Sequence, residues 1–140
     1  MGLIFAFGII ALLGLMALVR LAPIEPARWH VSPDVTGAWD SVLREPGGAR
    51  LRLSQSKGAP GELLVWLDAL AQETPRTARL AGSVAEGRIT WVTRSALWGF
   101  PDFTTAEVRP DGLYVHARLR FGREDIGVNA ARLEDWLAAL

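Results

Sequence analysis

The most suggestive group of side chains that could do chemistry lies in the second half of the chain, and most of its members are arginines. Alternation along Leu113–Phe121 puts Arg118 and Arg120 on one face of a predicted strand, and Asp125 follows where a final helix is expected to begin. Guanidinium forks beside the free amides of a helix N-terminus can bind an anion. The candidate residues for such an anion site are Arg94, Arg118, Arg120, Arg123, Asp125, Asn129 and Arg132.

A structural role for the same arginines competes with this site. They could pair with Asp102 and Asp125 and hold the loops against the sheet, with Asn129 as a helix cap or turn residue. Ion-pair networks are more common than ligand sites, so the bracing role is the favoured interpretation and the anion site is the alternative.

An enzymatic function would depend on a different group of residues. Asp102 and Asp125 could act as paired carboxylates with His116 as the acid–base partner, which would suit a hydrolase. The sequence has no GxSxG, HExxH or Walker-type motif to support this. We therefore expect a binding or scaffolding module with no catalytic residue, and keep the enzyme as the runner-up.

Composition excludes several function classes. The chain has no cysteine and only two histidines, His30 and His116, which excludes disulfides, thiolate zinc sites and a histidine-rich metal centre. Neither a metal nor a cofactor is expected. Fifteen basic residues balance fifteen acidic ones, so no overall positive field favours nucleic acid as a partner.

The first twenty-two residues predict a membrane anchor. Gly2 to Val19 is an uninterrupted run of apolar residues and glycine, which as a helix spans roughly 27 Å, close to the thickness of a hydrocarbon core. Arg20 can extend to the membrane interface, so the span is set at residues 2–22, before the prolines that follow. A cleaved signal peptide is the alternative, but the segment lacks a basic start and a small-residue cleavage site.

The anchor makes lipid an expected partner. A phospholipid headgroup is a plausible ligand for the arginines, because many headgroups lie beside a tethered domain. A small anionic ligand or a protein partner is also compatible with the sequence. Arg20 and Arg28 follow the span, which leans toward a cytoplasmic domain.

The remaining residues predict a two-layer α+β domain. Residues 23–61 read as a linker and a loop-rich segment, with a short helix near 39–43 and a short strand at 51–53. Residues 62–140 form the expected domain, in which a four-stranded antiparallel sheet packs against two helices on one face and leaves the other face wet. The expected helices are 62–73 and 127–140, and the expected strands are 77–84, 88–95, 103–109 and 113–121.

Aromatic residues surround the turn at Gly99–Asp102. Trp98, Phe100 and Phe103 could form an exposed lip for lipid or a partner, but large aromatic side chains are more often buried, so core packing is favoured.

Two stretches resemble a known family. They are RSALWGFPDFTT (residues 94–105) and HARLRFGREDIGVNAARLEDWL (residues 116–137), and they are similar to the bacterial family called domain of unknown function 1499. The segment RLAPIEPARWHVSP is similar to a membrane-attached subset of that family. The resemblance implies a compact domain without an assigned activity, so no catalytic residue carries over. With the anchor, it implies a single-pass protein of the bacterial inner membrane.

Overall fold

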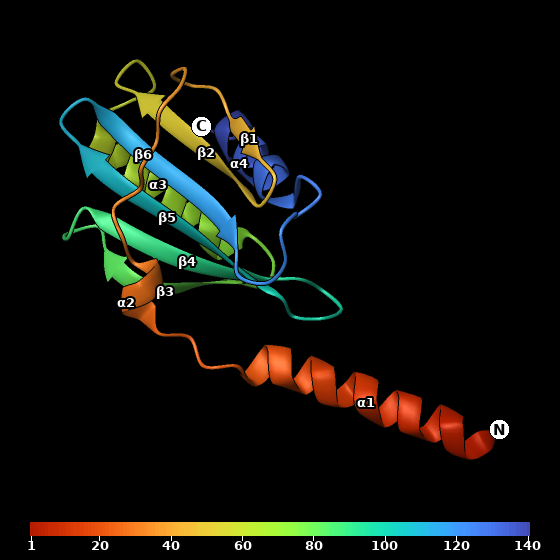
Figure 1. The fold of residues 1–140 in the computed structure, drawn as a ribbon. Helices are drawn as coiled ribbons and strands as arrows, with labels where there is room; N and C mark the ends of the chain where they lie inside the picture. Colours follow the sequence, from red (N-terminus) through yellow and green to blue (C-terminus); the bar gives the residue numbers. More distant parts are fainter.

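The computed structural model describes all residues 1–140 and shows one α+β domain with a separate N-terminal helix (Figure 1). The elements in chain order are α1 (Gly2–Leu21), α2 (Pro26–Trp29), β1 (Leu43–Glu45), β2 (Gly48–Ser54), α3 (Pro60–Glu73), β3 (Thr77–Ser83), β4 (Arg88–Arg94), β5 (Pro101–Arg109), β6 (Gly112–Leu119) and α4 (Val128–Ala138).

The sheet has six antiparallel strands in the order β1-β2-β6-β5-β4-β3, so the prediction of four strands was wrong. The helix-and-strand order from α3 to α4 matches the prediction, but β1 and β2 extend the sheet beside β6. In β2, Ala49, Leu51 and Leu53 are buried while Arg50 and Arg52 face the other side. The alternation of buried and exposed side chains in β2 becomes clear when β2 is seen to pair with β6. From the sequence alone, the surrounding Gly, Pro and Ser residues indicated a loop with only a short strand.

The short helix predicted near 39–43 is also absent. Trp39 instead makes an isolated parallel bridge with Arg52 of β2, and Asp40 accepts hydrogen bonds from the amide and the hydroxyl of Ser54, at 2.9 and 2.6 Å. Pairing with the sheet therefore replaces local helix formation in this segment.

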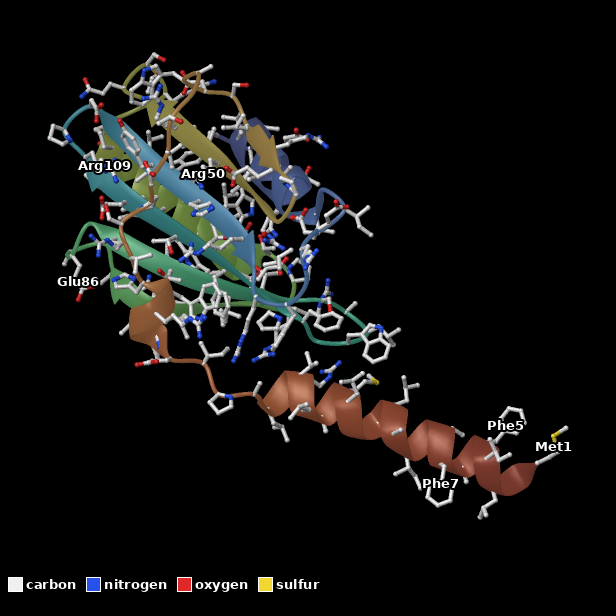
Figure 2. All side chains as sticks on the ribbon, in the orientation of Figure 1. Met1, Phe5, Phe7, Arg50, Glu86 and Arg109 are labelled. Atoms are coloured by element: carbon white, nitrogen blue, oxygen red, sulfur yellow. The ribbon has the colours of Figure 1, made fainter.

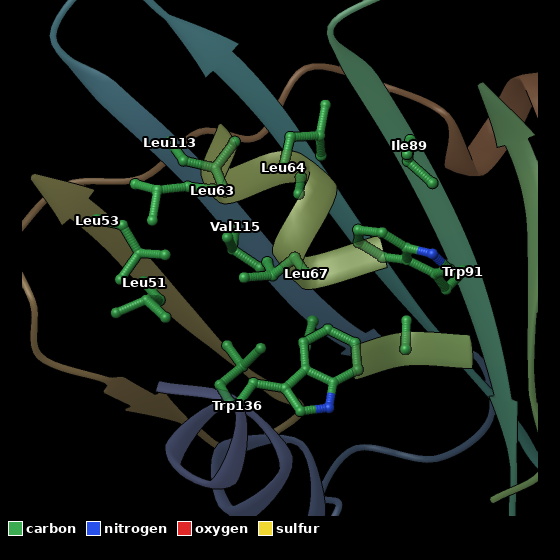
Figure 3. Close-up of a cluster of buried hydrophobic side chains, with 14 of the residues drawn as sticks. Leu51, Leu53, Leu63, Leu64, Leu67, Ile89, Trp91, Leu113, Val115 and Trp136 are labelled. Carbon is green, nitrogen blue, oxygen red and sulfur yellow. The ribbon is translucent and has the colours of Figure 1, made fainter. Parts of the chain in front are cut away.

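Helices α3 and α4 cover one face of the sheet and enclose the core (Figure 3). Trp91 of β4 and Trp136 of α4 pack edge to face with ring centroids 5.7 Å apart. Asp68 of α3 is buried beside them and accepts a hydrogen bond from Trp91 Nε1 at 3.0 Å. This face is dry, as the alternation of the strands predicted.

The opposite face is not left to solvent. Residues 22–40, called the strap from here on, run from the end of α1 through α2 and cross this face before reaching β1 (Figure 1). The prediction of a wet face was therefore wrong. Most residues that line this face are polar, and several of them bind the strap.

Helix α1 stands away from the domain with nearly all its side chains exposed, and Figure 2 shows Phe5 and Phe7 projecting from opposite sides of it. It is the one helix long and apolar enough to cross a membrane, a property shared by N-terminal anchors and signal sequences. Its last turn contacts the domain, because Arg20 Nη2 donates a 2.8 Å hydrogen bond to the carbonyl of Leu97.

Candidate functional site

All but one of the residues predicted to form one anion site lie in two different places. Arg118 lies on the strap-covered face and Arg120 just beyond the end of β6, while Arg94 ends β4 nearby. Asp125, Asn129 and Arg132 lie on the helix side of the sheet with Asp102, which pairs with Leu119 and therefore shares the side opposite Arg118. Arg123 lies in the exposed loop between β6 and α4.

The helix-side cluster is closed on itself. The amide nitrogen Nδ2 of Asn129 donates to Asp125 at 2.8 Å and to Asp102 at 3.1 Å, while Arg132 Nη1 donates to Asn129 Oδ1 at 2.7 Å. Asp125 also accepts the backbone amides of Gly127 and Asn129 and so caps the start of α4. These contacts fix the turn before α4 to the start of β5.

Burial changes the titration of this cluster. It raises the pKa of Asp102, an effect that the nearby Arg132 charge and the Asn129 hydrogen bond only partly offset. Burial also lowers the pKa of Arg132. The closest approach of the Arg132 and Asp102 charges is 3.7 Å, so Asn129 is the more direct link between them.

On the strap-covered face the arginines have different partners, because their guanidinium groups donate to backbone carbonyls of the strap. Arg118 donates to Trp29 O at 2.6 Å, and Arg120 donates to Pro23 O at 2.8 Å. Further along, Arg109 donates to Pro33 O at 2.6 Å, Arg50 to Asp34 O and Arg52 to Gly37 O. In Figure 2, Arg50 and Arg109 lie on this face near the crossing strap.

Two side chains of the strap hold it on the sheet. Trp29 stacks on the buried Phe103 with ring centroids 3.9 Å apart. His30 Nδ1 lies 2.9 Å from Thr90 Oγ1, which is 2.9 Å from Thr105 Oγ1, and that hydroxyl donates back to Trp29 O. Gly82 leaves room for this contact, since a Cβ there would lie 2.6 Å from His30 Cε1.

Four residues of this surface were not predicted from the sequence: Trp29, His30, Thr90 and Thr105. The available signal was weak: several polar residues alternate along one face of β4, β5 and β6, and such a face needs water or a partner. Only the tertiary structure shows that the partner is the chain itself.

Carboxylates are distributed unevenly along this face. At the end far from α1, Glu107 pairs with Arg88 and Arg109, and at the end of β1 Glu45 pairs with Arg50 of β2 at 2.7 Å. Burial alone would raise the pKa of Glu107, but hydrogen bonds from Ser32, Arg109 and Arg88 lower it overall. At the end near α1, no carboxylate oxygen lies within 4.0 Å of these arginines: Arg20, Arg28, Arg94, Arg118 and Arg120. We call these five residues the unpaired arginines.

The pKa values of Arg118 and His116 are lowered by this arrangement. Burial, followed by repulsion from Arg50, lowers the pKa of Arg118. Burial, followed by the charges of Arg118 and Arg50, lowers the pKa of His116 to about 4. His116 is therefore neutral near pH 7, and the positive charge of this region is carried by arginines.

Two cavities lie beside the predicted site residues. The one near α1 has a volume of about 260 Å³ and is lined by Pro23, Ile24, Glu25, Arg28, Trp29 and Arg120. A more open groove of about 540 Å³ lies on the helix side between α3 and α4, where Arg76 and Arg132 face Glu73 and Asp135. Of these two, the small cavity is the one that adjoins the unpaired arginines.

The three residues of the enzyme hypothesis, Asp102, Asp125 and His116, do not lie on the same side of the sheet. Asp102 and Asp125 are joined through Asn129, but His116 pairs with Thr105 and lies on the strap-covered face. The three side chains therefore share no cleft. The structure also has no group of three or more His, Asp or Glu side chains that could hold a metal ion.

Fold and site together define an antiparallel α+β domain whose second face is closed by its own N-terminal strap. A family model described as "Protein of unknown function (DUF1499)" matches residues 49–140, and the chain belongs to this family. The resemblance found in the sequence is thereby confirmed. No match is found among curated proteins or among solved structures.

Proposed function

We propose that the protein is a membrane-tethered binding module in which α1 is the anchor and the unpaired arginines bind an anionic group. The ligand class we favour is the phosphate of a phospholipid headgroup. The anchor would make this a single-pass protein of the inner membrane, and Arg20 and Arg28 next to the span favour a cytoplasmic domain.

The observation that carries this proposal is that none of the unpaired arginines has a carboxylate oxygen within 4.0 Å. Arg118 and Arg120 reach only carbonyl oxygens, which satisfy hydrogen bonds but carry no negative charge. A partly buried guanidinium gains more from an ionised partner than from a neutral one. An anion in the cavity beside Arg28 and Arg120 would supply that missing charge.

The location of the cavity favours a lipid as the source of the anion. Its lining begins two residues after the end of α1, at Pro23. If α1 spans the bilayer, Arg20 lies at the headgroup level and the cavity lies close by. Glu25 also lines the cavity, so the ligand must contact Arg28 and Arg120 on the side away from this carboxylate.

The test is lipid-dependent stabilisation of the full-length protein in dodecyl maltoside micelles. Phosphatidylglycerol at ten times its Kd adds about 1.4 kcal/mol of stability, so we expect Tm to rise by about 4 °C or more. Phosphatidylcholine should have a smaller effect. In Arg120→Ala and Arg28→Ala, the rise with phosphatidylglycerol should be largely lost.

Arg44→Ala is the matched control, because Arg44 pairs with Glu134 on the helix side and carries the same charge. It should keep the full rise in Tm. If Arg120→Ala lowers the Tm without lipid but leaves the lipid-dependent rise unchanged, the arginine only braces the strap and the proposal fails. If inorganic phosphate stabilises the protein as strongly as the lipid, the ligand is a small anion and not a headgroup.

A further inference from the structure

Exposed apolar side chains collect at the edge of the domain next to α1. Leu97 is 69% exposed, Phe100 38% and Phe121 41%, and Trp98 is half-buried beside them. The rings of Trp98 and Phe100 stack with centroids 6.0 Å apart, and Phe121 lies 6.2 Å from Phe100. We call these four residues the apolar edge. Phe103, which the sequence grouped with them, is instead buried under Trp29.

The loop that presents the apolar edge is held by its own hydrogen bonds. The amide of Ser95 donates to Phe100 O at 3.0 Å, and the amide of Phe100 donates to Ser95 Oγ at 2.9 Å. Arg94 Nη1 donates to Gly99 O at 2.9 Å from within the strand end. The exposed side chains are therefore preorganised, and little conformational entropy would be lost on binding.

Contact with α1 sets the position of this edge. The apolar run of α1 ends at Val19, and the next residue, Arg20, binds the carbonyl of Leu97. Gly99 permits this approach, since its φ is +73° and a Cβ there would lie 2.8 Å from Arg20 Cγ. Figure 1 shows the β4–β5 loop beside the last turn of α1.

We propose that the apolar edge inserts into the interfacial layer of the lipid bilayer and seats the domain on the membrane. This proposal rests on the anchor proposed above. If α1 spans the bilayer, the hydrogen bond between Arg20 and Leu97 places the edge at the depth where aromatic side chains are enriched. Burial of Leu97 and Phe100 would then remove exposed apolar surface of the domain near α1 from water.

The charges around the edge favour a lipid surface over a protein partner. Arg20, Arg94 and Arg120 flank the aromatic residues, and the guanidinium of Arg120 lies 4.9 Å from the Phe121 ring centroid. Apolar side chains with flanking arginines suit an interface in which acyl chains lie below anionic headgroups.

The absence of native cysteine allows a direct test in the full-length protein. A single cysteine replaces Leu97 and carries an environment-sensitive fluorophore, and the protein is reconstituted in vesicles of equal parts phosphatidylcholine and phosphatidylglycerol. We expect blue-shifted emission and several-fold stronger quenching by nitroxide lipids than for the same label at Val65, a residue 49% exposed on α3. Leu97→Cys and Val65→Cys both replace exposed side chains, so neither should prevent folding.

A third label, at Leu12 in the middle of α1, separates the two proposals. If the Leu12 label is quenched and the Leu97 label behaves like the Val65 label, the anchor holds and the seating of the domain is wrong. If the Leu12 label is also in water, the anchor itself is wrong and the seating is overturned with it. Quenching at Leu12 and Leu97, with none at Val65, supports the seating.

Discussion

At the scale of single residues, the role of each arginine depends on whether a carboxylate lies within reach. Arg132 and Asp102 share Asn129 inside a closed network, while Arg118 and Arg120 are bound by carbonyl oxygens alone. Sequence spacing grouped these arginines because they lie close together along the chain. The sheet separates them, because Arg118 projects from the strap-covered face and Arg132 lies on α4, which covers the other face.

The substitution His116→Gln tests the charge environment of the strap-covered face. Because burial and two arginines lower the pKa of His116 from its usual 6.5 to about 4, folding favours the neutral imidazole. Its contribution to stability is therefore complete above pH 6.5 and is lost as the pH falls toward 4. A lowering of this size corresponds to at most about 3 kcal/mol.

The measurement is the urea midpoint of the full-length protein in detergent between pH 7 and pH 4. The wild type should lose stability more steeply over this range than His116→Gln, since other acid-sensitive groups are common to both. Glu45, 3.8 Å away, attracts the charged imidazole and limits the difference. Parallel curves for the two proteins would show that His116 is not desolvated as described.

Substitution of Asp68 is a second test at this scale, because its effect on stability can be predicted from its contacts. Its buried carboxylate accepts from Trp91, Gln72 and Arg79, which connects α3 with β3 and β4. Asp68→Ala leaves the Trp91 indole and the Arg79 guanidinium without partners, and should cost about 2–3 kcal/mol of unfolding free energy, because Arg79 is partly exposed. In Glu134→Ala, where the lost pair with Arg44 is exposed, the cost should be below about 1 kcal/mol. Equal costs by denaturant titration would contradict this difference.

At the scale of elements, the strap is the part of the fold with the weakest sequence signature. It contains one helix of four residues, and its other hydrogen bonds go mainly to side chains of the sheet. A segment without internal periodicity can be ordered only by its surroundings. A large side chain of the strap that contacts the sheet is Trp29, which stacks on Phe103.

Trp29→Ala should release the strap while the helix side of the sheet stays folded. The loss of the stacked ring should lower the free energy of unfolding by about 2 kcal/mol, less than for a fully buried tryptophan. In limited trypsin digestion of the full-length protein, cleavage after Arg28 should become the earliest event. Trp66→Ala on the exposed side of α3 is the control and should leave the digestion pattern unchanged. Protection of Arg28 in Trp29→Ala would show that the carbonyl contacts alone hold the strap.

At the scale of the whole molecule, α1 and the domain meet through few but specific contacts. Arg20 binds the β4–β5 loop, and Arg120 binds the carbonyls of Pro23 and, at 3.5 Å, Ala22. These contacts leave no long flexible tether between helix and domain. A spanning α1 would therefore hold the domain close to the bilayer with one edge toward it.

The membrane-anchor proposal predicts that α1 remains part of the mature protein. The intact mass of the protein extracted from membranes should be close to 15.3 kDa, and alkaline carbonate should not release it. Removal as a signal sequence would give a mass lower by the whole of α1, and a protein found in the aqueous fraction. A thiol-reactive label at Lys57→Cys, added to sealed cells, would then report the side of the membrane on which the domain lies.

Local sequence patterns were enough to predict α1 and the order of the elements from α3 to β6 and α4. Hydrophobic spacing is a local property, so a twenty-residue apolar helix, a helix with one buried stripe and strands with alternating side chains could each be recognised from neighbouring residues. The same spacing placed Arg118 on the polar face of β6. The resemblance to the family also depended only on short motifs.

Tertiary structure alone decided the two outer strands, the closure of the polar face and the division of the arginines into two groups. β2 is a strand because β6 lies beside it, and the strap is ordered because Phe103, Thr105 and the arginines meet its backbone. These contacts join residues up to 98 positions apart. Such pairings depend on the free energy of the assembled sheet, which local sequence patterns do not contain.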